Sequence, residues 1–135
     1  MTSAVPCYCA TLRIAARKAT AVYDEALAPA GIALAQFSLL RKIERAGREV
    51  SLSELGRLAA LDRSTVGRNV KVMRRKGFIE VGSGDDRREA TGRLAEGGRA
   101  ALAAGAPLWR AAQARVEAKL GEGGAGQLRA LLAAL

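Results

Sequence analysis

The chain has 135 residues, half of them apolar and only 4% aromatic, and its 22 Lys and Arg against 13 Asp and Glu give a net charge of +9. This length predicts one domain, whose core is built mostly from aliphatic side chains. The excess of positive charge favours a polyanionic partner, with nucleic acid ahead of an anionic membrane.

The composition also disfavours several classes of protein. No apolar run reaches the roughly 18–20 residues that span a bilayer, and the first residues lack the pattern of a secretory signal, so we expect a cytoplasmic protein with no membrane partner. The chain has no histidine, and its two cysteines, Cys7 and Cys9, are separated by a single residue. A disulfide between them would close almost no loop, and a zinc site lacks ligands. No Ser or Cys has an evident base partner either, so we expect no enzyme, no metal and no cofactor.

Two long helices and a short one are predicted in the first part of the chain. Residues 9–28 and residues 34–46 have apolar side chains three or four positions apart, which is typical of an amphipathic helix. Gly47 ends the second of them. The spacing of Ser51 and Glu54 predicts a capping box at the start of a third, shorter helix.

The most basic segment follows at residues 62–76, which hold six Lys and Arg and one acid. Asp62 is typical of an N-cap, and Gly77 is typical of a helix end. Two valines and a methionine give the predicted helix an apolar stripe. The opposite face carries the candidate DNA-contacting residues Arg63, Ser64, Thr65, Arg68, Lys71 and Arg75. Such a helix suits a major groove and, with the short helix before it, predicts a helix-turn-helix, although an ordinary solvated helix can be equally basic.

After Gly77 the apolar period changes to two, which predicts a hairpin. Residues 78–81 indicate one strand, a glycine-rich turn follows, and residues 87–94 indicate a weaker return strand. A hairpin behind a helix-turn-helix is the outline of a winged helix, so the fold class is mainly α with a small wing of two or three strands. Arg87 and Arg88 at the tip suit a minor groove or phosphates; a plain solvated hairpin is the alternative.

The last part of the chain returns to a helical pattern. Residues 95–120 form one predicted segment, in which Pro107 predicts a kink or a new helix start. A final apolar helix is predicted at residues 127–135. Its leucines would expose more apolar surface than a chain end normally does, which implies a partner.

Three stretches, at residues 55–70, 77–80 and 86–98, carry motifs whose order and spacing resemble the MarR family of bacterial transcription regulators. The first is similar to the helix pair around the family's reading helix. The third is similar to the wing signature, an Asp, any residue and an Arg, then Leu-Thr and a glycine. Here Ala95 stands where Thr is usual and Gly92 lies in the second strand, two departures that would loosen the base of the wing.

The resemblance implies one MarR-type domain over residues 1–135. In it, residues 1–33 and 95–135 would be dimerisation helices and residues 34–94 the winged-helix DNA-binding core. It implies a homodimer that binds double-stranded DNA at a pseudo-palindromic operator and represses or activates transcription, with repression as the favoured role. By position, the residues that face the major groove would be Ser64, Thr65, Arg68 and Lys71. In the wing, Arg88 would enter the minor groove, Asp86 would fix the wing by a salt bridge, and Arg87 would assist at phosphates.

Two modes of regulation follow from the same resemblance. In the first, a small aromatic or anionic effector lies between the helical layer and the winged core, beside Tyr23, Phe37 and Trp109; plain core packing of these rings is the alternative. In the second, Cys9 is a peroxide-sensing thiol, because the N-terminus of a helix and nearby Arg13 favour the reactive form of a cysteine. An ordinary cysteine is the alternative there.

A further alternative is a non-specific architectural DNA-binding protein. The polar Ser64 and Thr65 beside Arg68 argue against it, because such side chains suit base readout.

Overall fold

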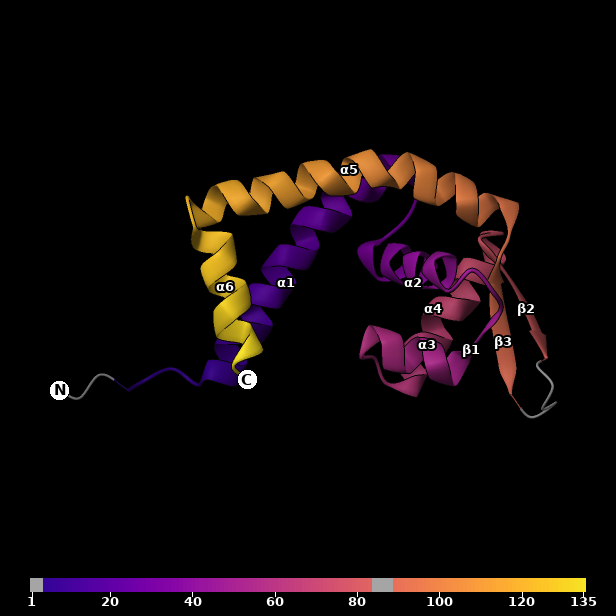
Figure 1. Cartoon of the computed structure of the whole chain (residues 1–135), viewed down its shortest axis with the longest axis horizontal. Coiled ribbons are helices and arrows are strands. Elements are labelled where there is room, and N and C mark those ends of the chain that lie inside the picture. The colour runs from indigo at the N-terminus through magenta and orange to yellow at the C-terminus, as the bar shows by residue number, and fades with distance from the viewer. Residues whose placement is uncertain (1–3, 84–88) are drawn as a thin grey trace.

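The computed structural model describes residues 4–83 and 89–135, and within them the chain forms six α-helices and a three-stranded antiparallel sheet (Figure 1). The helices are α1 (Tyr8–Leu27), α2 (Leu34–Ala46), α3 (Leu52–Ala59), α4 (Arg63–Arg75), α5 (Glu96–Leu120) and α6 (Gly124–Ala133). The strands are β1 (Val50–Ser51), β2 (Ile79–Ser83) and β3 (Ala90–Leu94), and a short 3-10 helix, η1 (Ala28–Ala30), joins α1 to α2. The predicted fold class, mainly α with a winged helix, is confirmed.

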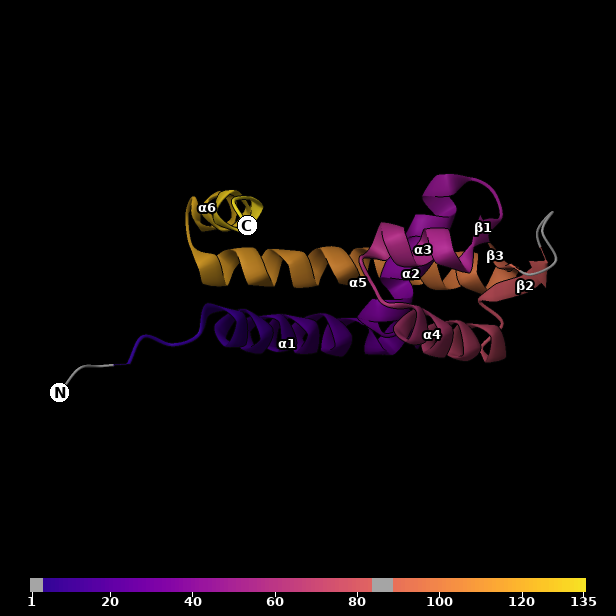
Figure 2. The same cartoon turned by 90° about the horizontal axis from the view of Figure 1, so that it is seen from below.

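The elements gather into two regions along α5, which runs the length of the molecule (Figures 1 and 2). We call residues 34–94 the winged unit; it holds α2, α3, α4 and the sheet beside the first half of α5. We call α1, α5 and α6 the helical layer. In this layer α1 runs obliquely to α5 and packs against it toward its own C-terminal end, and α6 leaves the far end of α5 at a steep angle.

Most of the buried core belongs to the winged unit. Its fully buried side chains include Phe37, Leu39, Leu40, Val50, Leu55, Val66 and Met73. In the helical layer, by contrast, α6 has no buried residue, and Leu131 is 72% exposed. The surplus apolar surface expected at the end of the chain is therefore present in the isolated chain.

The predicted helix boundaries in the winged unit are confirmed by their caps. Ser51 Oγ accepts a hydrogen bond from the backbone N–H of Glu54 at 3.1 Å, and α3 begins there. A capping box also requires the Glu54 side chain to accept from the backbone N–H of Ser51. This half of the prediction is wrong, because the Glu54 carboxylate forms a two-pronged ion pair with Arg48 instead. Gly77 has the left-handed conformation, with φ at +75°, that was expected after α4.

The sheet contains one strand that the sequence pattern did not locate. β1 is two residues long and pairs with β3, Val50 opposite Gly92 and Ser51 opposite Thr91. Two residues show no alternation, so only the pairing with β3 reveals this strand. β3 also pairs with all five residues of β2. Gly92 therefore lies in the central strand and has a strand partner on each side.

Two expectations for the last part of the chain are corrected. α5 runs without a break from Glu96 to Leu120 through Pro107, so no helix begins there. α6 begins at Gly124, earlier than expected, and ends at Ala133. Although α5 is long, no helix in the described part of the chain has the combination of length and apolarity that crossing a membrane requires.

The junction between the winged unit and α5 depends on two glycines. A Cβ at Gly97 would lie 2.5 Å from the carbonyl oxygen of Gly77, and one at Gly98 would lie 2.1 Å from that of Phe78. No side chain fits at either distance. The first turn of α5 therefore packs directly on the backbone that links α4 to β2, and this contact fixes the wing beside α4.

Candidate nucleic-acid interface

The basic face of α4 is the main candidate interface. Val66, Val70 and Met73 are buried against the rest of the winged unit, so the helix presents its other side to solvent. The predicted residues on that side are exposed, except for the half-buried Thr65: Arg63, Ser64, Arg68, Lys71 and Arg75. Arg74, which was not among the predicted residues, is also exposed and lines a surface hollow with Lys71 and Arg75. Three cations around one hollow suit a phosphate group.

The two hydroxyl residues of this face also take part in the cap of α4. Asp62 Oδ1 accepts from the backbone N–H of Thr65 at 2.8 Å and from Ser64 Oγ at 3.0 Å. These hydrogen bonds, the backbone one first, lower the pKa of Asp62, and the positive charge of Arg68 adds to the effect. Because the pKa is lowered on folding, the carboxylate's stabilising contribution is complete above the ordinary pKa of Asp and is lost as the pH falls through the lowered value.

Arg68 stands at the centre of the candidate surface. Its guanidinium Nη2 donates to Thr65 Oγ1 at 3.2 Å, which is one turn earlier on the same helix. This contact orients the side chain along α4 and leaves its other N–H donors unused within α4. A guanidinium held in this way keeps the fork that matches guanine O6 and N7.

The base of the wing is held by polar side chains. Arg93 Nε donates to Glu80 Oε2 at 2.8 Å across β2 and β3, and Thr91 Oγ1 donates to Glu49 Oε1. Ala95 is the residue directly before α5, and it forms no side-chain cap. The predicted wing residues Asp86, Arg87 and Arg88 lie outside the described residues.

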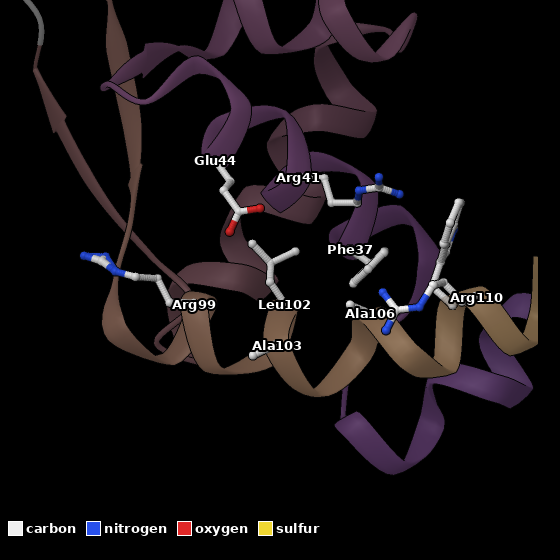
Figure 3. Close-up of a pocket in the computed structure, with 9 residues that line it drawn as sticks. Phe37, Arg41, Glu44, Arg99, Leu102, Ala103, Ala106 and Arg110 are labelled. Atoms are coloured by element: carbon white, nitrogen blue, oxygen red, sulfur yellow. The ribbon is translucent and has the colours of Figure 1, made fainter.

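A cavity of about 470 Å³ lies between α2 and α5 (Figure 3). Of the three aromatic residues predicted to line an effector cleft, Phe37 and Trp109 do so, together with Arg41, Glu44, Arg99, Leu102, Ala103, Ala106 and Arg110. The guanidinium carbon of Arg41 lies 4.6 Å from the centre of the Trp109 ring. In Figure 3, Glu44 points from α2 toward Leu102, whereas the guanidinium of Arg99 points away from the cavity. The arginines escaped sequence reasoning because α2 and α5 are distant in the chain.

Tyr23 is not part of this lining. Its hydroxyl donates to Gln113 Oε1 within the helical layer, and its ring centre lies 6.4 Å from that of Trp109. Burial raises the pKa of Tyr23, and the negative charge of Glu117 raises it further. Tyr23 therefore ties α1 to α5 next to Trp109.

The two cysteines lie at the start of α1. Cys7 is the residue before the first turn, Cys9 is in that turn, and both are free and exposed. Both sulfurs are therefore open to a small oxidant in the isolated chain.

Comparison with known proteins identifies the family to which the chain belongs. A model described as the MarR family matches residues 30–89. The chain is also similar to the transcriptional regulator MosR of Mycobacterium tuberculosis, crystallised in complex with DNA. The two are 40% identical over 95% of this chain and 92% of that one, with a TM-score of 0.85. The chain belongs to the MarR family of transcriptional regulators.

Other solved members of the family are consistent with this result. A second crystal structure of MosR gives 39% identity over 94% of this chain and 90% of that one, with a TM-score of 0.82. A mutant of Escherichia coli MarR complexed with operator DNA is 23% identical over 90% of this chain and 88% of that one, with a TM-score of 0.80, and shows the shared fold alone. No protein with a curated description matches the chain.

Proposed function

We propose that this MarR-family protein is a homodimeric, sequence-specific DNA-binding repressor that recognises a pseudo-palindromic operator. The observation that carries the proposal is α4, whose apolar side is buried while its cationic side faces solvent. The MosR structure, which is 40% identical and contains DNA, supports the same conclusion. Lys and Arg contacts with phosphates would supply most of the affinity, which would fall steeply with salt as counterions are released.

The proposed dimer would be formed by residues 1–33 and 95–135, with residues 34–94 left to contact DNA. The exposed leucines of α6 and the exposed apolar side chains of α1, Leu12 and Ile14, support this division. Large apolar side chains that stay exposed in this number are typical of an interface between subunits. A two-fold dimer would present two α4 helices roughly 34–36 Å apart, one DNA turn, to an operator of matching symmetry.

Base recognition is assigned to the exposed face of α4. Arg68 is the proposed guanine contact, and Ser64, Thr65 and Lys71 are its proposed neighbours in the major groove. Arg63, Arg74 and Arg75 would bind phosphates. Arg87 and Arg88 remain proposed wing contacts with phosphates and the minor groove, with Asp86 as the residue that steadies the wing; these three rest on the sequence alone.

The α2–α5 cavity is the proposed effector site. Arg41 and Arg110 supply positive charge, while Phe37 and Trp109 supply aromatic faces. This combination suits a small aromatic anion, because an anion pairs with guanidinium while the ring stacks. Calorimetric titration with aromatic carboxylates tests the site: binding that Arg41→Ala weakens supports it, and equal binding by the variant contradicts it.

Selection of bound DNA from a random pool tests the central proposal. We expect an enriched sequence made of two inverted half-sites, one helical turn apart between their centres. Enrichment of no sequence, or equal affinity for selected and random DNA, would favour a non-specific architectural protein instead.

Arg68→Ala tests the proposed base contact on the selected operator. We expect it to lower operator affinity by about 1–3 kcal/mol and to relax the preference at one base pair of each half-site, because one bidentate contact is lost. The control is Arg45→Ala, which removes the same charge from an exposed position near the end of α2, outside both the cationic face of α4 and the proposed dimer helices. Unchanged base preference in the Arg68 variant would contradict the assignment.

A thiol switch at Cys9 is a second candidate mode of regulation, favoured by the exposure of this sulfur in the first turn of α1. Oxidation there would place a polar group in the proposed dimer layer. Operator binding that peroxide weakens in the wild type but not in Cys9→Ser or Cys7→Ser would support it and identify the thiol. Binding that is insensitive to peroxide would contradict it.

A further inference from the structure

One flank of α4 is bound by side-chain hydrogen bonds to the corner between α1 and α2, which we define as residues 28–36. Gln36 Nε2 donates to Asn69 Oδ1 at 2.8 Å. Lys76 Nζ donates to the carbonyl oxygen of Gly31, also at 2.8 Å. Asn69 and Lys76 are seven residues apart, and therefore lie on the same flank of α4, two turns from each other. Neither bond was expected from the sequence, because each joins residues far apart in the chain.

The corner itself is fixed to α1. Gln36 Oε1 accepts from the backbone N–H of Ala33 at 3.0 Å, and the backbone N–H of Leu34 donates to Asp24 Oδ1 of α1 at 2.8 Å. Both ends of the Gln36 amide group are thus engaged, so its orientation is set. A continuous chain of hydrogen bonds leads from α1 through the corner to α4.

The other partner is equally constrained. Asn69 Nδ2 donates to the carbonyl oxygen of Thr65 at 3.0 Å, while its Oδ1 receives the bond from Gln36. Asn69 is half-buried and lies on the flank of α4, off its exposed cationic face. The bridge therefore acts on the same turn of α4 that carries Arg68.

The physical consequence concerns the rotation of α4 about its own axis. Its buried face consists of Val66, Val70 and Met73, and apolar packing has no direction of its own. Hydrogen bonds weaken steeply when they are misaligned. Base readout requires side chains held to within roughly 10–20° of the productive orientation. A directional bridge on the flank of α4 supplies this restraint.

We propose that Gln36 and Asn69 are positioning residues for base recognition: their bridge sets the rotation of α4 against α2 and so aims Arg68 and Lys71 at the base edges. The inference rests on the proposed function. It assigns the bridge to sequence selectivity rather than to overall affinity, because neither residue carries a charge that would attract phosphates.

The test compares the affinity for the selected operator with that for random DNA of equal length. This ratio does not depend on the fraction of protein that is folded. We expect Asn69→Ala and Gln36→Met each to lower the ratio at least about fivefold, the scale of one net hydrogen bond, and to leave random-DNA affinity within about twofold. The double variant should lose no more than either single one, because both remove one bridge.

A conservative variant and a matched control sharpen the result. Gln36→Glu keeps the side-chain length and an acceptor for Ala33 N–H, but it removes the donor to Asn69 Oδ1, and the Asn69 amide cannot flip without breaking its own bond to Thr65. It should therefore lower the ratio as Gln36→Met does. Gln113→Met is the control: Gln113 is likewise half-buried and hydrogen bonded, but its partner is Tyr23 of α1. It should leave the ratio unchanged.

Three outcomes would overturn the inference. If Asn69→Ala lowers the ratio and Gln36→Met does not, Asn69 contacts DNA directly. If Gln113→Met lowers the ratio as much as Gln36→Met, any loosening of helix packing has the same effect. If both variants weaken operator and random DNA in equal proportion, the bridge has no role in selectivity. A wild-type protein that selects no sequence contradicts the proposed function itself, and this is seen before any variant is compared.

Discussion

The winged unit and the helical layer differ in how completely each buries its apolar side chains. In the winged unit, α2, α3, α4 and the sheet enclose a continuous core, and Phe37, Leu40 and Leu55 are at most 2% exposed. In the helical layer, by contrast, α6 has no buried residue. Among the described residues, every exposed large apolar side chain except Leu58 lies in or beside a helix of this layer.

This difference separates two sources of stability. The winged unit gains its stability within one chain, since burying apolar surface is the main favourable term in folding. The leucines of α6 stay 40% or more exposed in the single chain, so part of their apolar surface is left for a second surface to cover. We therefore expect substitutions in the winged unit to change folding, and substitutions in the helical layer to change association.

The largest expected effect comes from charging the exposed stripe of α6. Leu128 and Leu131 are 40% and 72% exposed in the single chain, so replacing both by Lys should leave folding intact but prevent pairing. Losing one of two linked DNA-binding units should reduce operator affinity on the order of 10²-fold or more. Sedimentation velocity and operator titration measure the two effects.

Leu58→Lys is the control for that double variant, because Leu58 is 50% exposed but lies in the winged unit. It should leave the mass in solution unchanged. If the α6 variant stays paired, the division between the two regions is wrong.

A smaller effect is expected at the junction between the regions. Gly98→Ala would bring a methyl group to 2.1 Å from the carbonyl oxygen of Phe78, so α5 must shift, at a cost of about 1–3 kcal/mol in the free energy of unfolding. Urea titration measures it. Gly126→Ala, in α6, meets no atom within 4 Å and should stabilise by roughly 0.5–1 kcal/mol; equal effects of the two variants would contradict the close contact.

The smallest effect concerns the turn between α3 and α4. Ala60 has φ at +54°, the only described non-glycine residue with positive φ, and a Cβ is strained there. Ala60→Gly should therefore raise the free energy of unfolding by about 0.5–1 kcal/mol. Ala59→Gly, one position earlier and still within α3, should lower it by a similar amount. If thermal unfolding shows that both variants change the stability in the same direction, the backbone at Ala60 is not strained.

The features that were predicted correctly depend on residues close together in the chain. Asp62 and Gly77 mark the ends of α4, and the spacing of Val66, Val70 and Met73 identifies its buried side. Caps and helical period act over a few residues. The cationic face of α4 could therefore be assigned from the order of its residues, although its contact with DNA stays a prediction.

The features that were missed or wrong depend on distant partners. β1 exists because it pairs with β3, and Arg41 lines the cavity because α5 packs beside α2. Tyr23 was expected beside the cleft, but its hydroxyl bonds Gln113 of α5, a residue 90 positions away in the chain. Pro107 was expected to kink the helix or to start a new one; no new helix starts there, because α5 continues through Pro107 while it packs on α1 and the winged unit.

The amino-acid pattern alone thus specified the helices, the family and a positively charged α4, since these depend on local period, caps and side-chain chemistry. Only the tertiary structure decided the rotation of α4, the shape of the α2–α5 cavity and the exposure of the leucines of α6. Those properties depend on contacts such as Gln36 with Asn69, between residues that nothing in the local sequence brings together.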